Sequence, residues 1–264
     1  MRYKPYNLPR FTSVDSLVNE LRELGSGKYE PGDVRSATEV IHKRVSKALF
    51  QALNEKDYNE VAKILSYKDL SKKELVNVDG YNVVEYLLYN SVNSAFITLY
   101  RKHIEQITYY FTNIPILFTI ILGKKNFELI SFFLRDDFFR ENLKKEHISN
   151  AFFIAVEGGQ TELVEFIAKD YECMLDIRSI EATMIYFIGN DKVKELEIVF
   201  SQENLIAKFS EENVEKMIGY AVLNKNVAIV KFMIMNPYFA SFLESGDQNM
   251  QKVVLNLVSD KLLN

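Results

Sequence analysis

Tryptophan is absent from this chain, and cysteine occurs once, at Cys173. A single cysteine excludes an internal disulfide framework and is typical of a protein from a reducing compartment. The 264 residues include only five prolines and ten glycines, which leaves little room for linkers or low-complexity segments. Because 48% of the residues are hydrophobic and 26% are charged, the composition is that of an ordinary folded domain. We therefore expect one domain over the whole length.

Long apolar runs are also absent. The longest one, residues 114–122, is far too short to span a bilayer and is expected to form a buried inner helix. The opening residues lack the apolar core of a secretory signal peptide. The net charge is −4, with charges of both signs interspersed, so no basic face indicates nucleic-acid binding. The sequence thus predicts a cytoplasmic protein that neither enters a membrane nor binds nucleic acid.

Residues with metal-binding or cofactor-binding chemistry are scarce. The three histidines are His42, His103 and His147, and no pair of His or Cys residues stands at ligand spacing. No glycine motif of the kind that binds phosphate occurs in the chain. We therefore expect no metal site and no cofactor.

What the chain does contain is a repeated pattern of fourteen residues. Two small or apolar residues precede a polar step, and two apolar pairs follow it, as in AVEGGQTELVEFIA at residues 155–168 and AVLNKNVAIVKFMI at residues 221–234. The fifth residue of each copy serves as a marker, and the six markers stand 32 to 35 residues apart: Lys56, Ser91, Lys125, Gly159, Asp191 and Lys225. A period near 33 residues is typical of stacked helical hairpins.

The fourth copy illustrates the hairpin. Phe152, Ala155 and Val156 lie at helical spacing before the glycine step, and residues 163–168 carry a second apolar stripe after it. One hairpin cannot bury both stripes, so it needs a neighbour on each side. The sequence therefore predicts an all-α solenoid of about six helical hairpins.

Several residues of these copies fit the register of a known repeat. The fourth copy carries Ala155, Gly159, Glu162, Leu163 and Val164, and the sixth carries Ala221, Ile229 and Val230. Gly80 precedes the helices of the second copy. In this register the chain resembles the ankyrin repeat, TPLHxAAxxGHxEIVxxLL, from about residue 45 to the C-terminus. The resemblance implies a non-enzymatic array that binds a partner protein through its concave face.

The copies also depart from the ankyrin pattern. None has the proline and histidine of TPLH at their proper positions, and the β-branched residues Ile114, Ile148 and Val214 stand in place of the turn glycine. A left-handed turn disfavours such side chains, so these repeats are expected to lack the protruding β-hairpin and to use plain turns. Arrays as degenerate as this resemble those of viral and intracellular-pathogen proteins, which implies an effector that engages a host protein.

The two ends of the chain differ from the array. Residues 1–44 are expected to form an extended arm and two capping helices, the first capped by Thr12 or Ser13 and the second by Asp33. The array is expected over residues 45–245, and a single amphipathic helix over residues 246–264 is expected to cap its other end. All three parts are expected to pack as one domain.

Two surfaces of such an array are candidates for binding. The side chains just before each inter-helix step are expected to face the concave groove: Asn54, Glu55, Tyr89, Asn90, Lys124, Glu157, Asn190, Leu223 and Asn224. The second surface consists of the aromatic connections after the outer helices, at residues 136–139, 170–171 and 236–239. For these connections we favour burial, with the aromatic rings sealing the space between repeats.

Three functional hypotheses remain. The preferred one is the protein-interaction module. The alternative is a cysteine-dependent hydrolase or transferase, since His147 and Cys173 flank the same repeat, although hairpin geometry favours placing them on opposite sides of it. The third hypothesis takes Leu8 and Pro9, together with Leu17, Leu21 and Leu24, as an F-box-like ubiquitin-ligase adaptor segment.

Overall fold

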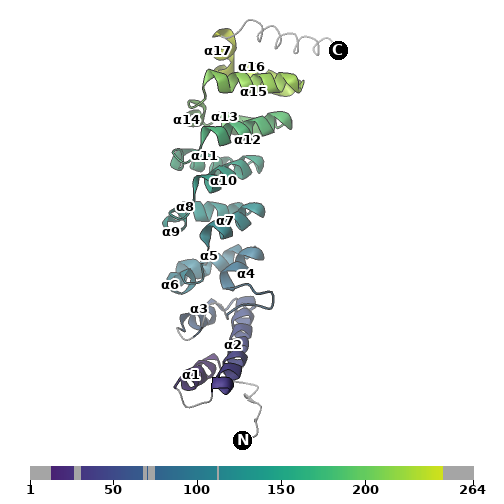
Figure 1. The fold of residues 1–264 in the computed structure, drawn as a ribbon. Coiled ribbons are helices and arrows are strands. Elements are labelled where there is room, and N and C mark those ends of the chain that lie inside the picture. The colour runs from purple at the N-terminus through teal and green to yellow at the C-terminus, as the bar shows by residue number, and fades with distance from the viewer. Residues whose placement is uncertain (1–12, 27–30, 68–69, 71–74, 112, 246–264) are drawn as a thin grey trace. The chain divides into compact units, whose positions relative to one another are not determined.

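The computed structural model describes residues 13–26, 31–67, 70, 75–111 and 113–245 (Figure 1). Within these ranges all regular secondary structure is helical, so the expected all-α class is confirmed for the described part of the chain. The helices are α1 (Val14–Leu24), α2 (Pro31–Asn54), α3 (Tyr58–Ser66), α4 (Val83–Tyr89), α5 (Asn93–Lys102), α6 (Ile104–Thr108), α7 (Ile114–Gly123), α8 (Phe127–Arg135), α9 (Asp137–Arg140), α10 (Lys145–Glu157), α11 (Thr161–Asp170), α12 (Ile177–Gly189), α13 (Val193–Phe200), α14 (Glu203–Ile206), α15 (Glu211–Leu223), α16 (Val227–Met235) and α17 (Pro237–Ser245). The chain divides into two compact units, residues 1–121 and 122–264. The N-terminal arm expected at residues 1–11 and the C-terminal capping helix expected at residues 246–264 lie outside the described residues.

The first unit is organised around α2, which has 24 residues and so extends about 36 Å at 1.5 Å per residue. Both α1 and α3 pack against it. The helix begins at Pro31, two residues before the expected cap at Asp33. Proline is well suited to the first helical position, where its missing N–H would have had no partner. Because α2 is continuous to Asn54, the second capping helix and the first helix of the first repeat are one element.

Helix α1 is fixed to α3 by a polar contact at one point. The Asp15 carboxylate accepts a hydrogen bond from Lys63 Nζ at 2.6 Å and another from the Tyr67 hydroxyl. These bonds, that of Lys63 first, hold the pKa of Asp15 below its usual range. At the start of the helix Ser13 acts as the cap, as predicted, since its Oγ accepts from Ser16 N at 3.2 Å. Leu17 of α1 is buried in the core of the unit.

The second unit consists of helical hairpins that pack on one another. Its hairpins include α10 with α11, α12 with α13, and α15 with α16. The first helices of these hairpins contact one another in the order α10, α12, α15, and the second helices do so in the order α11, α13, α16 (Figure 1). Each hairpin therefore covers an apolar face of the next, as the sequence pattern requires.

The step between the two helices of each hairpin has one recurring backbone conformation. Positive φ angles between 49° and 64° occur at all six marker residues of the sequence repeat: Lys56, Ser91, Lys125, Gly159, Asp191 and Lys225. In the fourth copy, Gly159 N donates to Val156 O at 2.9 Å and Gln160 N donates to Ala155 O at 2.8 Å. This pair of bonds is the Schellman motif, which ends a helix with a left-handed residue. The sequence period therefore corresponds to a repeated helix-ending geometry.

The three positions at which β-branched residues replace the turn glycine of the ankyrin pattern lie in helices, and none of them has a positive φ. Ile114 is the first residue of α7, and Ile148 and Val214 lie within α10 and α15. Each of these side chains is buried, with at most 8% of its surface exposed. Burial of a branched apolar side chain on a helix face removes the left-handed position that the ankyrin register places there. Gly80 does occupy such a position, with φ of 84°.

One aromatic side chain of each connection is buried, as predicted, whereas Phe138 is exposed and Tyr238 is half-buried. Phe139, Tyr171 and Phe239 each have no exposed surface. Phe139 stacks on Phe133 with ring centroids 3.9 Å apart, and the Tyr171 hydroxyl donates to the Leu134 carbonyl oxygen. Burial raises the pKa of Tyr171 to about 12. The Tyr171 bond to Leu134 and the contact between Phe239 and Phe200, with ring centroids 4.7 Å apart, join successive hairpins of the second unit, so these rings belong to the core.

Candidate functional site

The nine predicted concave-face residues occupy equivalent places, at the C-terminal ends of the first helices. They are Asn54 and Glu55 at the end of α2, Tyr89 and Asn90 at α4, Lys124 at α7, Glu157 at α10, Asn190 at α12, and Leu223 and Asn224 at α15. All are exposed except Tyr89 and Glu157, which are half-buried. The register inferred from the sequence therefore selects one structural position in every hairpin.

Three of these residues have a local structural task. The side-chain amides of Asn90, Asn190 and Asn224 each donate to the carbonyl oxygen four residues earlier, at 2.8, 2.7 and 2.7 Å. Each of these carbonyls also accepts the backbone N–H of the same asparagine, at 3.0, 3.1 and 3.1 Å, so the amide caps the helix end with a second hydrogen bond. Capping explains why asparagine recurs at this position without any reference to a ligand.

Among the other predicted concave-face residues, some contact neighbouring side chains and one is a strongly exposed apolar residue. Glu157 Oε2 accepts from Lys125 Nζ at 2.8 Å within the second unit. Tyr89 stacks on Tyr81, with ring centroids 4.4 Å apart. Leu223 is 81% exposed at the end of α15, a large exposed apolar side chain on the second unit.

Asn54 and Glu55 line a groove of about 1080 Å³ in the first unit. One wall is a face of α2, and the other is the loop before α4 together with Tyr86 of α4. The complete lining is Glu39, His42, Lys43, Ser46, Lys47, Phe50, Gln51, Asn54, Glu55, Val76, Asn77, Val78, Asp79 and Tyr86. From Glu39 to Glu55 the helical wall extends about 24 Å. That length matches about seven residues of an extended peptide at roughly 3.3 Å each.

The loop wall is held in a defined turn by Asn77. Its side-chain oxygen Oδ1 accepts from Asp79 N at 3.0 Å and from Tyr81 N at 2.9 Å. The backbone closes the same turn, since Asn77 N donates to Tyr81 O at 2.9 Å. Gly80 supplies the left-handed residue, with φ of 84°. The turn is thus fixed by its own hydrogen bonds before any ligand arrives.

Val78 stands at the tip of this turn and is 101% exposed. An apolar side chain with no contacts on a well-bonded turn contributes nothing to folding, because it buries no surface. It is the kind of residue that contributes on association with another molecule.

The end of the groove near the step is aromatic. Phe50 and Tyr86 meet edge to face with ring centroids 5.1 Å apart, and the Tyr86 hydroxyl donates to Asn54 Oδ1 at 3.3 Å. Both rings are half-buried. They offer apolar surface beside a polar amide, a combination that is common in protein-binding sites.

The sequence pattern predicted only a small part of this groove. It selected Asn54 and Glu55 but not the α2 residues before them, nor Val78. A signal for the helical wall was present, since Lys43, Lys47 and Phe50 recur at spacings of three and four residues, which places them on one face. No local pattern could show that the loop lies opposite that face.

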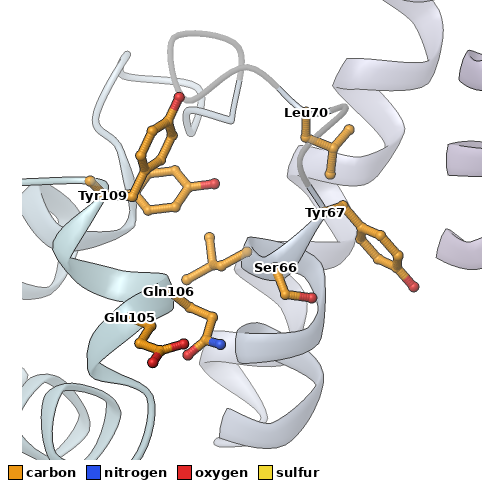
Figure 2. A pocket seen from close by; sticks show the side chains of 8 residues that line it. Ser66, Tyr67, Leu70, Glu105, Gln106 and Tyr109 are labelled. Atoms are coloured by element: carbon orange, nitrogen blue, oxygen red, sulfur yellow. The ribbon is translucent and has the colours of Figure 1, made fainter.

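A smaller pocket of about 380 Å³ lies between the end of α3 and α6. Leu70, Gln106 and Tyr109 are among its lining residues, and the Tyr67 ring points away from Tyr109 in Figure 2. Tyr110 is buried beside it, and burial raises the pKa of its phenol. Its size and mixed lining make it a weaker candidate than the groove along α2.

Among the residues that the structure describes, no group of three or more His, Cys, Asp or Glu side chains could hold a metal ion. Cys173 is exposed after α11, and His147 Nδ1 accepts from Lys144 N at 3.2 Å at the start of α10. No helix in the described ranges is long and apolar enough to cross a membrane.

Comparison with known proteins found no matching family model, no matching curated protein and no matching solved structure. The resemblance to ankyrin repeats therefore depends on the residues and their register alone.

Proposed function

We propose that this protein is a non-enzymatic interaction module, built as a solenoid of about six ankyrin-like hairpins with a cap at each end. Two observations support this architecture. The six step residues share one left-handed conformation at the repeat interval, and hairpins of the second unit pack on one another in chain order. An array of this kind uses a surface rather than an enclosed active site.

The groove along α2 is the observation that carries the functional proposal. It combines a long helical face, a turn fixed by hydrogen bonds and an aromatic end with a polar rim. Interfaces are typically dominated by a few aromatic or apolar anchors within a ring of polar residues. We propose that a segment of a partner protein binds in this groove, and that the step residues of later hairpins form a second contact surface.

The hydrogen bond made by His147 favours interaction over cysteine-dependent catalysis. A nucleophilic thiol requires a base within hydrogen-bond reach. His147 Nδ1 already accepts the N–H of Lys144 and so helps to begin α10. From the degeneracy of the repeats we infer further that the protein is a pathogen or viral effector, that the partner is a host protein, and that binding takes place in the cytoplasm.

Affinity purification followed by mass spectrometry tests the proposal. The groove variant carries Val78→Asp and Asn54→Arg, which alter an exposed turn tip and an exposed helix end. A second variant tests the later step residues with Tyr89→Ala, Lys124→Glu, Glu157→Lys and Asn190→Ala. The matched control carries Glu165→Ala and Lys169→Ala, both exposed on α11. Circular dichroism establishes that each variant is folded.

We expect a partner that wild type and the control retain and that the groove variant loses. Loss in the second variant as well would extend the site to the later hairpins. A partner retained by both variants would contradict the groove and move the site to the N-terminal arm or another surface. If no partner is captured by wild type, the interaction proposal is wrong, and labelling of Cys173 by a thiol-reactive probe becomes the next measurement.

A further inference from the structure

The charges of the groove are unevenly satisfied. Its three acidic residues each have a neighbour: Glu39 pairs with Arg35 at 3.5 Å, Glu55 accepts from Gln51 Nε2 at 2.8 Å, and Asp79 accepts from Asn77 Nδ2 at 3.2 Å. Lys43 and Lys47 also line the groove and are exposed, and neither forms an ion pair or hydrogen bond with any other described residue. Glu55 and Asp79 accept these hydrogen bonds from neutral amides and so keep their negative charge. Around Lys43 and Lys47, however, the charge without a counter-ion among the described residues is positive, although the whole chain carries −4.

The two lysines have a defined spacing. They lie four residues apart, so their positions on α2 are about 6 Å apart along the axis. In an extended peptide, alternate side chains on one side are separated by about 7 Å. The two ammonium groups can therefore meet two acidic side chains that alternate along an extended segment. Phe50 follows Lys47 by one turn, where the groove becomes aromatic.

We propose that the groove binds an acidic linear segment of a partner protein, with two acidic side chains at Lys43 and Lys47. An apolar side chain of the same segment lies against Phe50, Tyr86 and Val78. This inference rests on the proposed interaction function and specifies the chemistry of the partner. The lysines supply selection by charge, and the aromatic end supplies the apolar anchor.

The same surface is poorly suited to a nucleic acid. Binding to a phosphate backbone requires many basic contacts in a row. Here only two lysines occur, and the uncompensated carboxylates of Glu55 and Asp79 in the same groove would repel further phosphates. A protein segment with a short acidic stretch and an apolar residue fits both the charges and the apolar lining.

A selection from random dodecapeptides displayed on phage tests the inference with the full chain immobilised. It is carried out on wild type, on the charge-reversed Lys43→Glu/Lys47→Glu variant, and on a Lys169→Glu/Lys194→Glu control. The control residues are exposed on α11 and α13, and the control undergoes the same change in net charge. Because the groove lysines are exposed, their replacement leaves the core intact.

We expect wild type and the control to enrich peptides with two acidic residues followed by an aliphatic or aromatic one. The reversed variant should enrich basic residues in place of the acidic pair. A peptide selected on wild-type protein is then synthesised, and fluorescence anisotropy should give a Kd about tenfold larger for the reversed variant than for wild type. This difference should shrink at high salt, because salt screens exposed charges.

Other outcomes separate the two proposals. Peptides that lose binding with Val78→Asp but have no acidic preference would overturn this inference and leave the interaction function standing. Displacement of the peptide by a single-stranded oligonucleotide whose binding needs the same lysines would overturn it in favour of nucleic acid. If no selected peptide depends on any groove residue, both the inference and the groove as a binding site are wrong.

Discussion

The left-handed step residues lead to a prediction in which similar substitutions have opposite effects. We consider Gly159→Ala, Lys225→Gly and Gly123→Ala, all in the second unit. Gly159 and Lys225 have φ angles of 64° and 53°. Gly123 ends α7 with no left-handed φ, and a Cβ built on it meets nothing within 4 Å.

The magnitudes follow from backbone strain and from the unfolded chain. A side chain in the left-handed region costs about 1–2 kcal/mol. Replacing glycine by alanine also stabilises by about 0.4–1 kcal/mol, because the unfolded chain loses freedom. Gly159→Ala should therefore lower the free energy of unfolding by about 0.5–1 kcal/mol. Lys225→Gly should raise it by a similar amount, since the two terms exchange signs.

Gly123→Ala serves as the control for the substitution itself. Here no strain is introduced, so the gain of helix propensity and the lost freedom of the unfolded chain should stabilise by about 0.5–1 kcal/mol. Urea denaturation followed by circular dichroism measures all three variants against wild type. In a domain of 150–250 residues, 1 kcal/mol also moves the Tm by about 2–4 °C.

The order of stabilities decides the outcome. Gly159→Ala should be the least stable, below wild type, and Lys225→Gly and Gly123→Ala should lie above it. If Gly159→Ala is as stable as Gly123→Ala, residue 159 does not adopt a left-handed conformation. The shared geometry of the six steps would then be wrong, and with it the correspondence between the sequence period and the structure.

Two further predictions concern the core. Ala155→Asp and Ile229→Asp each place a charge at a position with no exposed surface, so each should lower the free energy of unfolding, measured by urea denaturation, by about 3–5 kcal/mol. Ala182→Asp, on the exposed face of α12, should lower it by only about 0.5 kcal/mol. Equal stabilities for Ala155→Asp and Ala182→Asp would contradict the proposed register. Burial raises the pKa of Tyr171 to about 12, so folding favours the neutral phenol. The contribution of this phenol to the free energy of unfolding is complete below pH 10 and is lost as the pH rises toward 12. Tyr171→Phe should lower the free energy of unfolding by about 1 kcal/mol near neutral pH, because the hydrogen bond to Leu134 is lost. The variant should also show a smaller decline in stability between pH 10 and 12. An unchanged decline would assign the loss of stability at alkaline pH to other residues.

The sequence by itself determined the helical hairpins and their interval. Apolar pairs on both sides of a polar step require two helices that bury one stripe each, and this pattern needs only local periodicity. The burial of aromatic side chains in the short connections could also be predicted, because burying apolar surface is favourable, and it is found at Phe139, Tyr171 and Phe239. The left-handed conformation that the six step residues share was harder to predict from the sequence, since five of the six are not glycine.

Where the chain departs from the ankyrin pattern, tertiary packing gives the physical reason. Ile114, Ile148 and Val214 occupy positions that are turns in the family pattern, yet they lie on helices with buried side chains. Burial of a branched apolar side chain between helices stabilises the folded state. In these copies this gain outweighs the tendency of the ankyrin pattern to form a left-handed turn. A pattern that matches in spacing can therefore fail at individual positions.

Only the tertiary structure decided where the candidate site lies. The groove brings a face of α2 opposite a turn at Asn77 that is more than twenty residues later in the sequence. Neither wall is distinctive alone: α2 has an ordinary mixed face, and the turn has an ordinary glycine. Contacts between segments distant in sequence depend on how the intervening helices pack, which local periodicity does not encode. The sequence therefore determined the repeated unit, and the packing of those units determined which surface is open to a partner.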